Sequence, residues 1–161
     1  MRIELTLNGE PTVMDVEADE ILASAIRRHG WTGVKRGCQD GSCGACTVLL
    51  DGVAVRSCLL FAAQAEGREV TTIEGIGSIE DPHPLQVAFV DHGAVQCGYC
   101  IPGMIVAAKA LLDERPRPSR QEIEAALDGN LCRCTGYVKQ VAAVEDAASR
   151  LAPGTAKGGD R

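Results

Sequence analysis

The sequence is poor in aromatic residues, in histidine and in positive charge. Its 161 residues include one Trp, two Tyr, two Phe and three His, and 16 Lys and Arg are outnumbered by 22 Asp and Glu. The formal charge of -6 argues against a nucleic-acid-binding surface, which needs a basic stripe. Because aromatic rings are so few, we expect a core filled mainly by Ala, Val, Leu and Ile.

Long apolar runs are also missing. No segment approaches the roughly 20 apolar residues of a membrane-spanning helix. The first ten residues, MRIELTLNGE, alternate between apolar and polar as a strand does. They lack the charged start and apolar run of a secretion signal. We therefore expect no membrane span and a cytoplasmic location.

The three histidines, His29, His83 and His92, all lie outside the cysteine-rich segments. A Rieske iron–sulfur site needs two histidines beside two cysteines, so the sequence excludes that class of site. We expect surface or structural roles for all three.

Cysteine, in contrast, is abundant, with eight residues. Disulfides are rare in a reducing cytosol, where grouped cysteines more often bind metal or carry out redox chemistry. The cysteines form two sets. The first cysteine group is Cys38, Cys43, Cys46 and Cys58, and the second cysteine group is Cys97, Cys100, Cys132 and Cys134.

The first cysteine group has the spacing C-x4-C-x2-C followed by a more distant cysteine. This is the plant-type spacing for a [2Fe-2S] cluster. Gly37, Gly41 and Gly44 flank the thiols, and we expect them to supply the positive φ angles that such a loop needs. A four-cysteine zinc site is the alternative, although zinc sites favour paired C-x2-C hooks.

A hairpin explains how the fourth cysteine of this group reaches the other three. Asp51-Gly52 is a two-residue turn signal between apolar segments. The pairing that this turn imposes places Cys46 opposite Ser57, one residue before Cys58. The hairpin therefore returns Cys58 to the loop.

The second cysteine group is a C-x2-C pair followed, 31 residues later, by a C-x-C pair. This spacing also suits zinc, although C-x-C is less usual in a zinc hook. Both pairs precede expected helices, one with Pro102 in its first turn. Because helix N-termini stabilise thiolates, we expect Cys100 and Cys134 to be favoured as thiolates in a second metal site between helices.

The remaining pattern predicts a β-rich half followed by a helical half. Asn8-Gly9 is a type I′ hairpin signal, and Asp19 is expected to cap the helix EILASAIRRHG. Ser119 and Glu122 form a capping box for a later helix. We expect an α+β chain with a β-rich domain, a linker, a helical bundle and a loose tail, at residues 1–76, 77–84, 85–152 and 153–161.

Three segments, GCQDGSCGACTV, QCGYCIPGM and GNLCRCTGY, together resemble the small iron–sulfur subunit of the molybdenum hydroxylase family. That family includes xanthine dehydrogenase, aldehyde oxidoreductase, carbon monoxide dehydrogenase and 4-hydroxybenzoyl-CoA reductase. The resemblance covers roughly residues 1–150, and all eight cysteines match in order and spacing.

The resemblance implies a plant-ferredoxin-like β-grasp domain followed by a four-helix bundle, each with one [2Fe-2S] cluster. The first cysteine group would hold the cluster nearer a flavin, and the second the cluster nearer molybdenum. Gln96 and Cys134 match positions that lie against the pterin cofactor in relatives.

The same resemblance implies an oxidoreductase complex in which this chain relays single electrons and holds no catalytic residue. Molybdenum-pterin and FAD would belong to a large and a medium partner subunit, in a dimer of heterotrimers. The substrate is then read by a partner's pocket, so this sequence does not identify it. A free two-cluster ferredoxin-like carrier and a zinc-stabilised interaction module are the alternative functions.

Four basic residues lie next to the cysteines and could offset the negative charge of bound clusters: Lys35, Arg36, Arg56 and Arg133. Arg133 stands between Cys132 and Cys134. We therefore expect its removal to lower the reduction potential of the second cluster.

Overall fold

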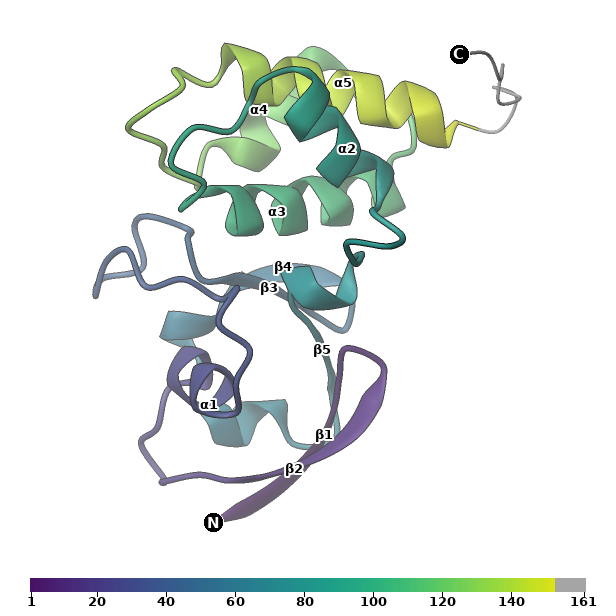
Figure 1. Ribbon diagram of the computed structural model, residues 1–161. Coiled ribbons are helices and arrows are strands. Elements are labelled where there is room, and N and C mark those ends of the chain that lie inside the picture. Colours follow the sequence, from purple (N-terminus) through teal and green to yellow (C-terminus); the bar gives the residue numbers. More distant parts are fainter. Residues whose placement is uncertain (153–161) are drawn as a thin grey trace.

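The structure is a computed structural model, which describes residues 1–152. Figure 1 shows two stacked parts, a β-sheet with one helix below and a group of four helices above. The α+β class expected from the sequence is confirmed. The expected loose tail, residues 153–161, lies outside the described residues.

The lower part is a five-stranded mixed sheet with the order β2-β1-β5-β3-β4. β1 and β5 run parallel, and the other neighbouring strands run antiparallel. The strands are β1 (Arg2–Leu7), β2 (Glu10–Asp15), β3 (Thr47–Leu50), β4 (Val53–Arg56) and β5 (Glu69–Thr71). Short 3-10 turns follow at Ser57–Leu59, Ala62–Ala65 and Ile73–Gly75.

Both predicted hairpins are present. Asn8 and Gly9 have φ angles of 53° and 83° between β1 and β2, as a type I′ turn requires. Asp51 and Gly52 take 49° and 80° between β3 and β4. The turn residues therefore set the strand register, as predicted.

The predicted start of helix α1 is wrong. The helix spans Leu22–Arg28, and Ile21 is its N-cap with no side-chain hydrogen bond, so Asp19 caps nothing. Ile21 is still extended because it forms a β-bridge with Phe61. This long-range pairing delays the helix beyond the point that the local sequence indicates.

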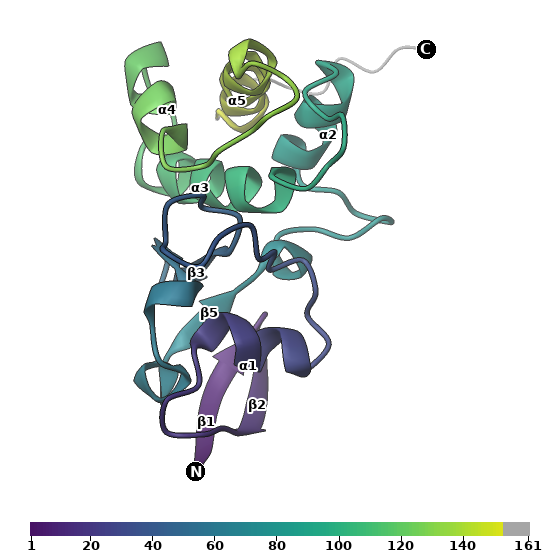
Figure 2. The same ribbon diagram turned by 90° about the vertical axis from the view of Figure 1, so that its left-hand side faces the viewer.

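The upper part consists of α2 (Pro84–Asp91), α3 (Ile101–Glu114), α4 (Arg120–Leu127) and α5 (Val138–Leu151). Figure 2 shows α3 lying between the sheet and the other three helices. The capping box of Ser119 and Glu122 opens α4, as predicted. None of the helices in residues 1–152 is long and apolar enough to cross a bilayer.

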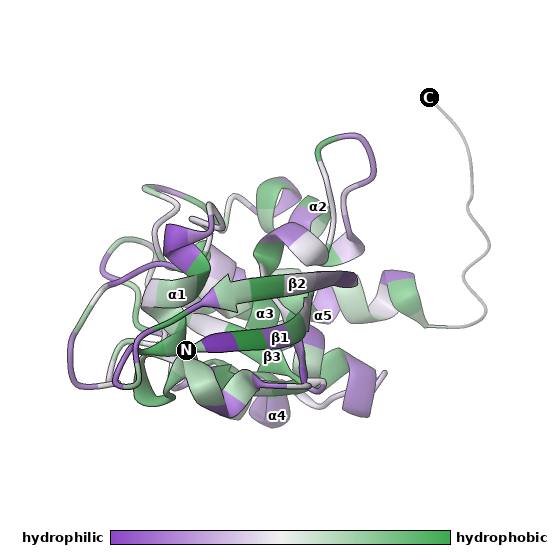
Figure 3. Cartoon of the chain, turned by 90° about the horizontal axis from the view of Figure 1, so that it is seen from below, coloured by the Kyte–Doolittle hydropathy of each residue, from purple (hydrophilic) through white to green (hydrophobic). Residues whose placement is uncertain are grey.

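Two hydrophobic cores fill the two parts. In the lower core, Ile3, Leu5 and Leu7 of β1 alternate with more exposed residues. Figure 3 shows hydrophobic and hydrophilic colours alternating along β1. The upper core is built around Phe89 and Met104, both fully buried. Most other members of both cores are aliphatic, in line with the shortage of aromatic residues.

The two parts meet where α3 crosses the cysteine-bearing loop. A Cβ atom built on Gly103 of α3 would lie 2.4 Å from the carbonyl oxygen of Gly44. Only glycine permits such an approach of helix backbone to loop backbone. Gly103 therefore fixes how closely the helices sit on the first cysteine group.

Candidate metal centres

The first cysteine group converges on one cavity. Three of its cysteines lie on the loop between α1 and β3, and Cys58 lies on the 3-10 turn that follows β4. All four line a cavity of about 360 Å³, together with Lys35 and Arg36. The structure therefore brings together the four thiols that the spacing pointed to.

The β3–β4 hairpin places Cys58 in this cavity. Both the backbone N–H and the hydroxyl of Ser57 donate to the carbonyl oxygen of Cys46, at 3.4 and 2.7 Å. Cys46 thus faces Ser57, as the two-residue turn predicts.

The glycines of this loop have two different roles. Gly41 and Gly44 take the expected positive φ angles of 80° and 69°. Gly37 is not among the residues with positive φ, so the prediction is wrong for it. A Cβ atom on Gly37 would instead lie 2.9 Å from Cys43 Sγ. Gly37 is needed because the backbone passes against a sulfur.

The second cysteine group lines a separate cavity of about 540 Å³. Cys97 and Cys100 come from the turn between α2 and α3, and Cys132 and Cys134 from the loop between α4 and α5. Cys43 borders this cavity as well as the first one. The two thiol-lined cavities therefore share part of a wall.

The eight thiols are arranged two by two. Cys97 and Cys134 are joined by a hydrogen bond, and the pKa values of Cys38, Cys58 and Cys100 are shifted by the neighbouring thiols of Cys43, Cys46 and Cys132. The sulfurs of Cys97 and Cys134 are 3.6 Å apart. Two thiolates on one tetrahedral metal, with bonds of about 2.3 Å, lie roughly 3.8 Å apart. The spacing of Cys97 and Cys134 thus suits two ligands of one iron, and a [2Fe-2S] cluster is held by four cysteines.

Two further observations describe these thiols. All eight are free, with no disulfide among them. Within residues 1–152, no three thiol, imidazole or carboxylate groups are arranged to hold a single metal ion.

In each group one thiol has a lowered pKa and two have a raised pKa: Cys38 against Cys43 and Cys58, and Cys132 against Cys100 and Cys134. The backbone N–H of Cys43, with that of Asp40, lowers the pKa of Cys38 to about 7. Burial, reinforced by the neighbouring Cys46, raises the pKa of Cys58 to about 12. Burial also raises the pKa of Cys100 to about 12.

Cys132 is the favoured thiolate of the second group. Burial opposes its ionisation, but hydrogen bonds from the Thr135 hydroxyl and from the N–H groups of Cys134 and Thr135 outweigh it. They lower the pKa of Cys132 to about 7.

Cys100 is the N-cap of α3, as the sequence predicts, whereas Cys134 lies before Tyr137, the N-cap of α5. The pKa of Cys134 is raised by its hydrogen bond to Cys97. Moreover, α5 begins only at Val138, because Tyr137 takes a left-handed φ of 68°.

Sequence reasoning missed three residues that surround Cys132. Thr135 Oγ1 lies 3.1 Å from its sulfur, and Gln140 Nε2 lies 3.8 Å from it. The Tyr137 hydroxyl accepts the backbone N–H of Cys132 at 2.8 Å. Thr135 and Tyr137 are polar residues just after the C-x-C pair, and this was the only sequence signal for them. Gln140, six residues after Cys134, had no such signal.

Gln96 and Cys134 are brought together at the surface. The side-chain amide of Gln96 donates to the carbonyl oxygen of Cys134 at 3.2 Å, and both residues are exposed. They lie beside Cys97, which is also exposed. This is the outer face of the second cysteine group.

The basic residues and the histidines take separate places. Arg133 lines the second cavity. The Arg56 guanidinium donates to the carbonyl oxygen of Gly129 at 3.2 Å.

The three histidines lie outside both cysteine groups. His29 is the C-cap of α1, His83 is the N-cap of α2, and a ring nitrogen of His92 lies 3.0 Å from a carboxylate oxygen of Asp146.

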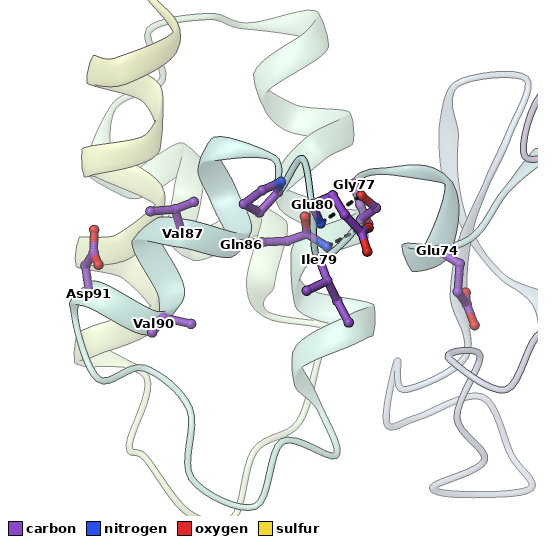
Figure 4. Close-up of a pocket in the computed structure, with 10 residues that line it drawn as sticks. Glu74, Gly77, Ile79, Glu80, Gln86, Val87, Val90 and Asp91 are labelled. Carbon is purple, nitrogen blue, oxygen red and sulfur yellow. Dashed lines mark hydrogen bonds between the residues drawn. The ribbon is translucent and has the colours of Figure 1, made fainter. Parts of the chain in front are cut away.

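A larger cavity, of about 700 Å³, lies on the linker and α2, away from both cysteine groups (Figure 4). Its lining includes Ile79, Glu80 and Val90 and contains no cysteine or histidine. The side chain of Gln86, which lines the cavity, donates to the carbonyl oxygen of Gly77 at 3.3 Å. This cavity is separate from the metal centres.

Two family models match the chain. A 2Fe-2S iron-sulfur cluster binding domain matches residues 5–72, and a [2Fe-2S] binding domain matches residues 72–145.

Relatives match along nearly the whole chain. The nicotinate dehydrogenase small FeS subunit of Eubacterium barkeri is 49% identical, covering 93% of this chain and 96% of its own length. The nicotine 6-hydroxylase small subunit of Paenarthrobacter nicotinovorans is 46% identical, with 94% and 92% covered. Aldehyde oxidoreductase of Megalodesulfovibrio gigas is 48% identical over 90% of this chain, which is 16% of that protein.

Solved structures agree with these matches. Quinoline 2-oxidoreductase from Pseudomonas putida contains a chain with a TM-score of 0.90 and 47% identity, covering 93% of this chain and 94% of that one. Aldehyde oxidoreductase from Desulfovibrio desulfuricans gives a TM-score of 0.91 at 47% identity, covering 93% of this chain and 17% of that one. The chain belongs to the family of small [2Fe-2S] iron–sulfur subunits of the molybdenum hydroxylases.

Proposed function

We propose that this chain relays single electrons between a molybdenum-pterin site and a flavin, both held by partner subunits of one oxidoreductase. The observation that carries this proposal is that two four-thiol cavities share Cys43 in their walls. Two one-electron centres so close together suit the stepwise passage of an electron pair.

In this proposal Cys38, Cys43, Cys46 and Cys58 hold the cluster nearer the flavin. Cys97, Cys100, Cys132 and Cys134 hold the cluster nearer molybdenum. A [2Fe-2S] cluster supplies an acceptor and donor of one electron at a time, and the protein sets its potential and surroundings. Residues 1–76 and 85–152 would be the two cluster-binding domains, joined by 77–84.

The protein's own contribution is to hold the sulfurs and to place charge and hydrogen bonds around them. Cys46 is nearly fully buried, which keeps water from that sulfur. Lys35 and Arg36 line the first cavity and Arg133 the second, where each offsets negative charge. No residue of the chain is assigned a catalytic role.

The exposed face around Gln96 and Cys134 is the proposed contact with the pterin of the large subunit. Their mutual hydrogen bond and their exposure beside Cys97 support this assignment. A medium subunit with FAD would contact the first cysteine group, in a dimer of heterotrimers. A cytoplasmic location is consistent with eight free thiols.

The substrate is proposed to lie with the large subunit. Relatives named for nicotinate and for aldehyde match this chain almost equally, at 49% and 48% identity. The sequence of the iron–sulfur subunit therefore does not separate these substrate classes.

The test is to purify the chain with everything that accompanies it, and to combine metal analysis with EPR of the dithionite-reduced sample. We expect about four irons per chain and two distinct S = 1/2 signals. Stoichiometric zinc without an EPR signal would contradict the proposal. Elution as a lone monomer from native extract would favour the free ferredoxin-like carrier.

A further inference from the structure

Gln140, in the first turn of α5, is a polar side chain with no exposed surface. Its Oε1 atom is buried and has no hydrogen-bond partner. Burying an amide without satisfying it costs free energy, and an aliphatic side chain would fill the same volume without that cost. A glutamine at this buried position therefore needs a reason, and the contacts of its amide nitrogen supply one.

The surroundings fix which way the amide faces. Its Nε2 atom lies 3.4 Å from the carbonyl oxygen of Ala94. A carbonyl oxygen can only accept, so the flipped amide would place two acceptors together. The other contacts of Nε2 are Thr135 Oγ1 and, at 3.8 Å, Cys132 Sγ. One N–H thus goes to Ala94, and the other points at Thr135 and Cys132.

This orientation also determines the direction of the Thr135 hydroxyl. Because Thr135 Oγ1 accepts an N–H from Gln140, its own hydrogen must point elsewhere. The sulfur of Cys132 is 3.1 Å away. The hydroxyl therefore donates to that sulfur, which also receives the N–H of Cys134 at 3.4 Å.

We propose that Gln140 is a positioning residue that directs the Thr135 hydroxyl at the Cys132 sulfur and so raises the reduction potential of the second cluster. Hydrogen bonds to cysteine sulfur tune the potential of iron–sulfur clusters because they stabilise the added negative charge. The inference rests on the proposed function, since it requires a cluster on the second cysteine group.

The test uses redox titrations of the purified holo-protein, followed by EPR. The first cluster serves as an internal reference in every sample. Thr135→Val removes the hydroxyl at constant shape, and Thr135→Ser retains it as the matched control. Gln140→Met removes the amide and keeps an unbranched side chain. The double variant Thr135→Val/Gln140→Met completes a thermodynamic cycle.

Thr135→Val is expected to lower the potential of the second cluster by about 59 mV, a tenfold change in a one-electron equilibrium. The first cluster should not move, and Thr135→Ser should stay near the wild type. Gln140→Met should shift the same cluster in the same direction. Because Gln140 acts mainly through Thr135, the double variant should match Thr135→Val alone.

An unchanged second potential in either single variant, with full iron content, would overturn the inference. So would additive shifts in the double variant, since these would mean that Gln140 does not act through Thr135. If Gln140→Met loses the second cluster, an unchanged potential in Thr135→Val would still overturn the inference, because the Thr135 hydroxyl is the group through which Gln140 acts. A wild-type protein with only two irons would instead overturn the proposed function.

Discussion

The backbone N–H of Leu131 donates to the carbonyl oxygen of Cys43 at 2.9 Å. Cys43 belongs to the first cysteine group, and Leu131 directly precedes Cys132 of the second. The two thiol-bearing loops are thus joined by a main-chain hydrogen bond that side-chain substitutions leave in place. We therefore expect changes at single side chains to alter one centre without displacing the other.

Removing one cysteine from each group should separate the two centres. Cys58→Ala is expected to abolish one EPR signal and Cys134→Ala the other, each with about half of the iron lost. Metal analysis and EPR on the two variants measure this, and each variant is the control for the other. Loss of both signals in either variant would show that the centres are not independent.

Arg133→Ala is expected to lower the reduction potential of the second cluster, because a positive charge beside two ligands stabilises the reduced state. Arg133→Lys keeps the charge and should keep most of the potential. Arg120→Ala, at an exposed position of α4, is a control for general charge. An EPR-monitored redox titration measures the shift, and an unchanged or raised midpoint in Arg133→Ala would refute the prediction.

Gly103→Ala should destabilise the holo-protein although alanine favours helix by about 1 kcal/mol over glycine. The added methyl would meet the carbonyl oxygen of Gly44 at 2.4 Å, and overpacking of this kind costs about 1–3 kcal/mol or more. The denaturation midpoint of the holo-protein measures the balance. A more stable variant would mean that α3 is free to move away from the loop.

His83 should make the start of α2 sensitive to pH. Its Nδ1 accepts the N–H of Leu85 at 3.2 Å, which only the neutral ring can do. Burial, with Lys109 nearby, holds the pKa of His83 below its usual value. The cap is therefore fully present above about pH 6.5 and is lost as pH falls through the lowered pKa.

The loss should cost about 1 kcal/mol, the usual contribution of an N-cap. His83→Asn keeps a capping oxygen that does not titrate, and it should remove the pH dependence. Amide hydrogen exchange at Leu85 between pH 8 and pH 5, corrected for intrinsic rates, measures it in both proteins. Equal pH dependence in both would count against His83 as the cause.

The parts of the fold that follow from short-range chemistry could be predicted from the sequence. The turn at Asp51-Gly52 admits one strand register, so the position of Cys58 beside Cys46 followed from counting residues. The capping box of Ser119 and Glu122 is equally local. Such features depend on neighbours within a few residues, which a sequence displays directly.

Features that depend on distant contacts could not be predicted. Asp19 is a reasonable cap by local rules, but the bridge between Ile21 and Phe61 keeps the chain extended there. Gly37 is needed for its closeness to the Cys43 sulfur and not for its φ angle. Gln140 lies on α5 and contacts Cys132 there, and the spacing of the cysteines does not predict that contact.

The exposure of Cys97 and Cys134 has a consequence for assembly. Oxygen and small oxidants have direct access to these two sulfurs until another surface covers them. Cys46, deep in the first loop, has no such vulnerability. Because no thiol of the first cysteine group is exposed to this degree, a chain without its partner subunits is expected to lose its second cluster to oxidation before its first.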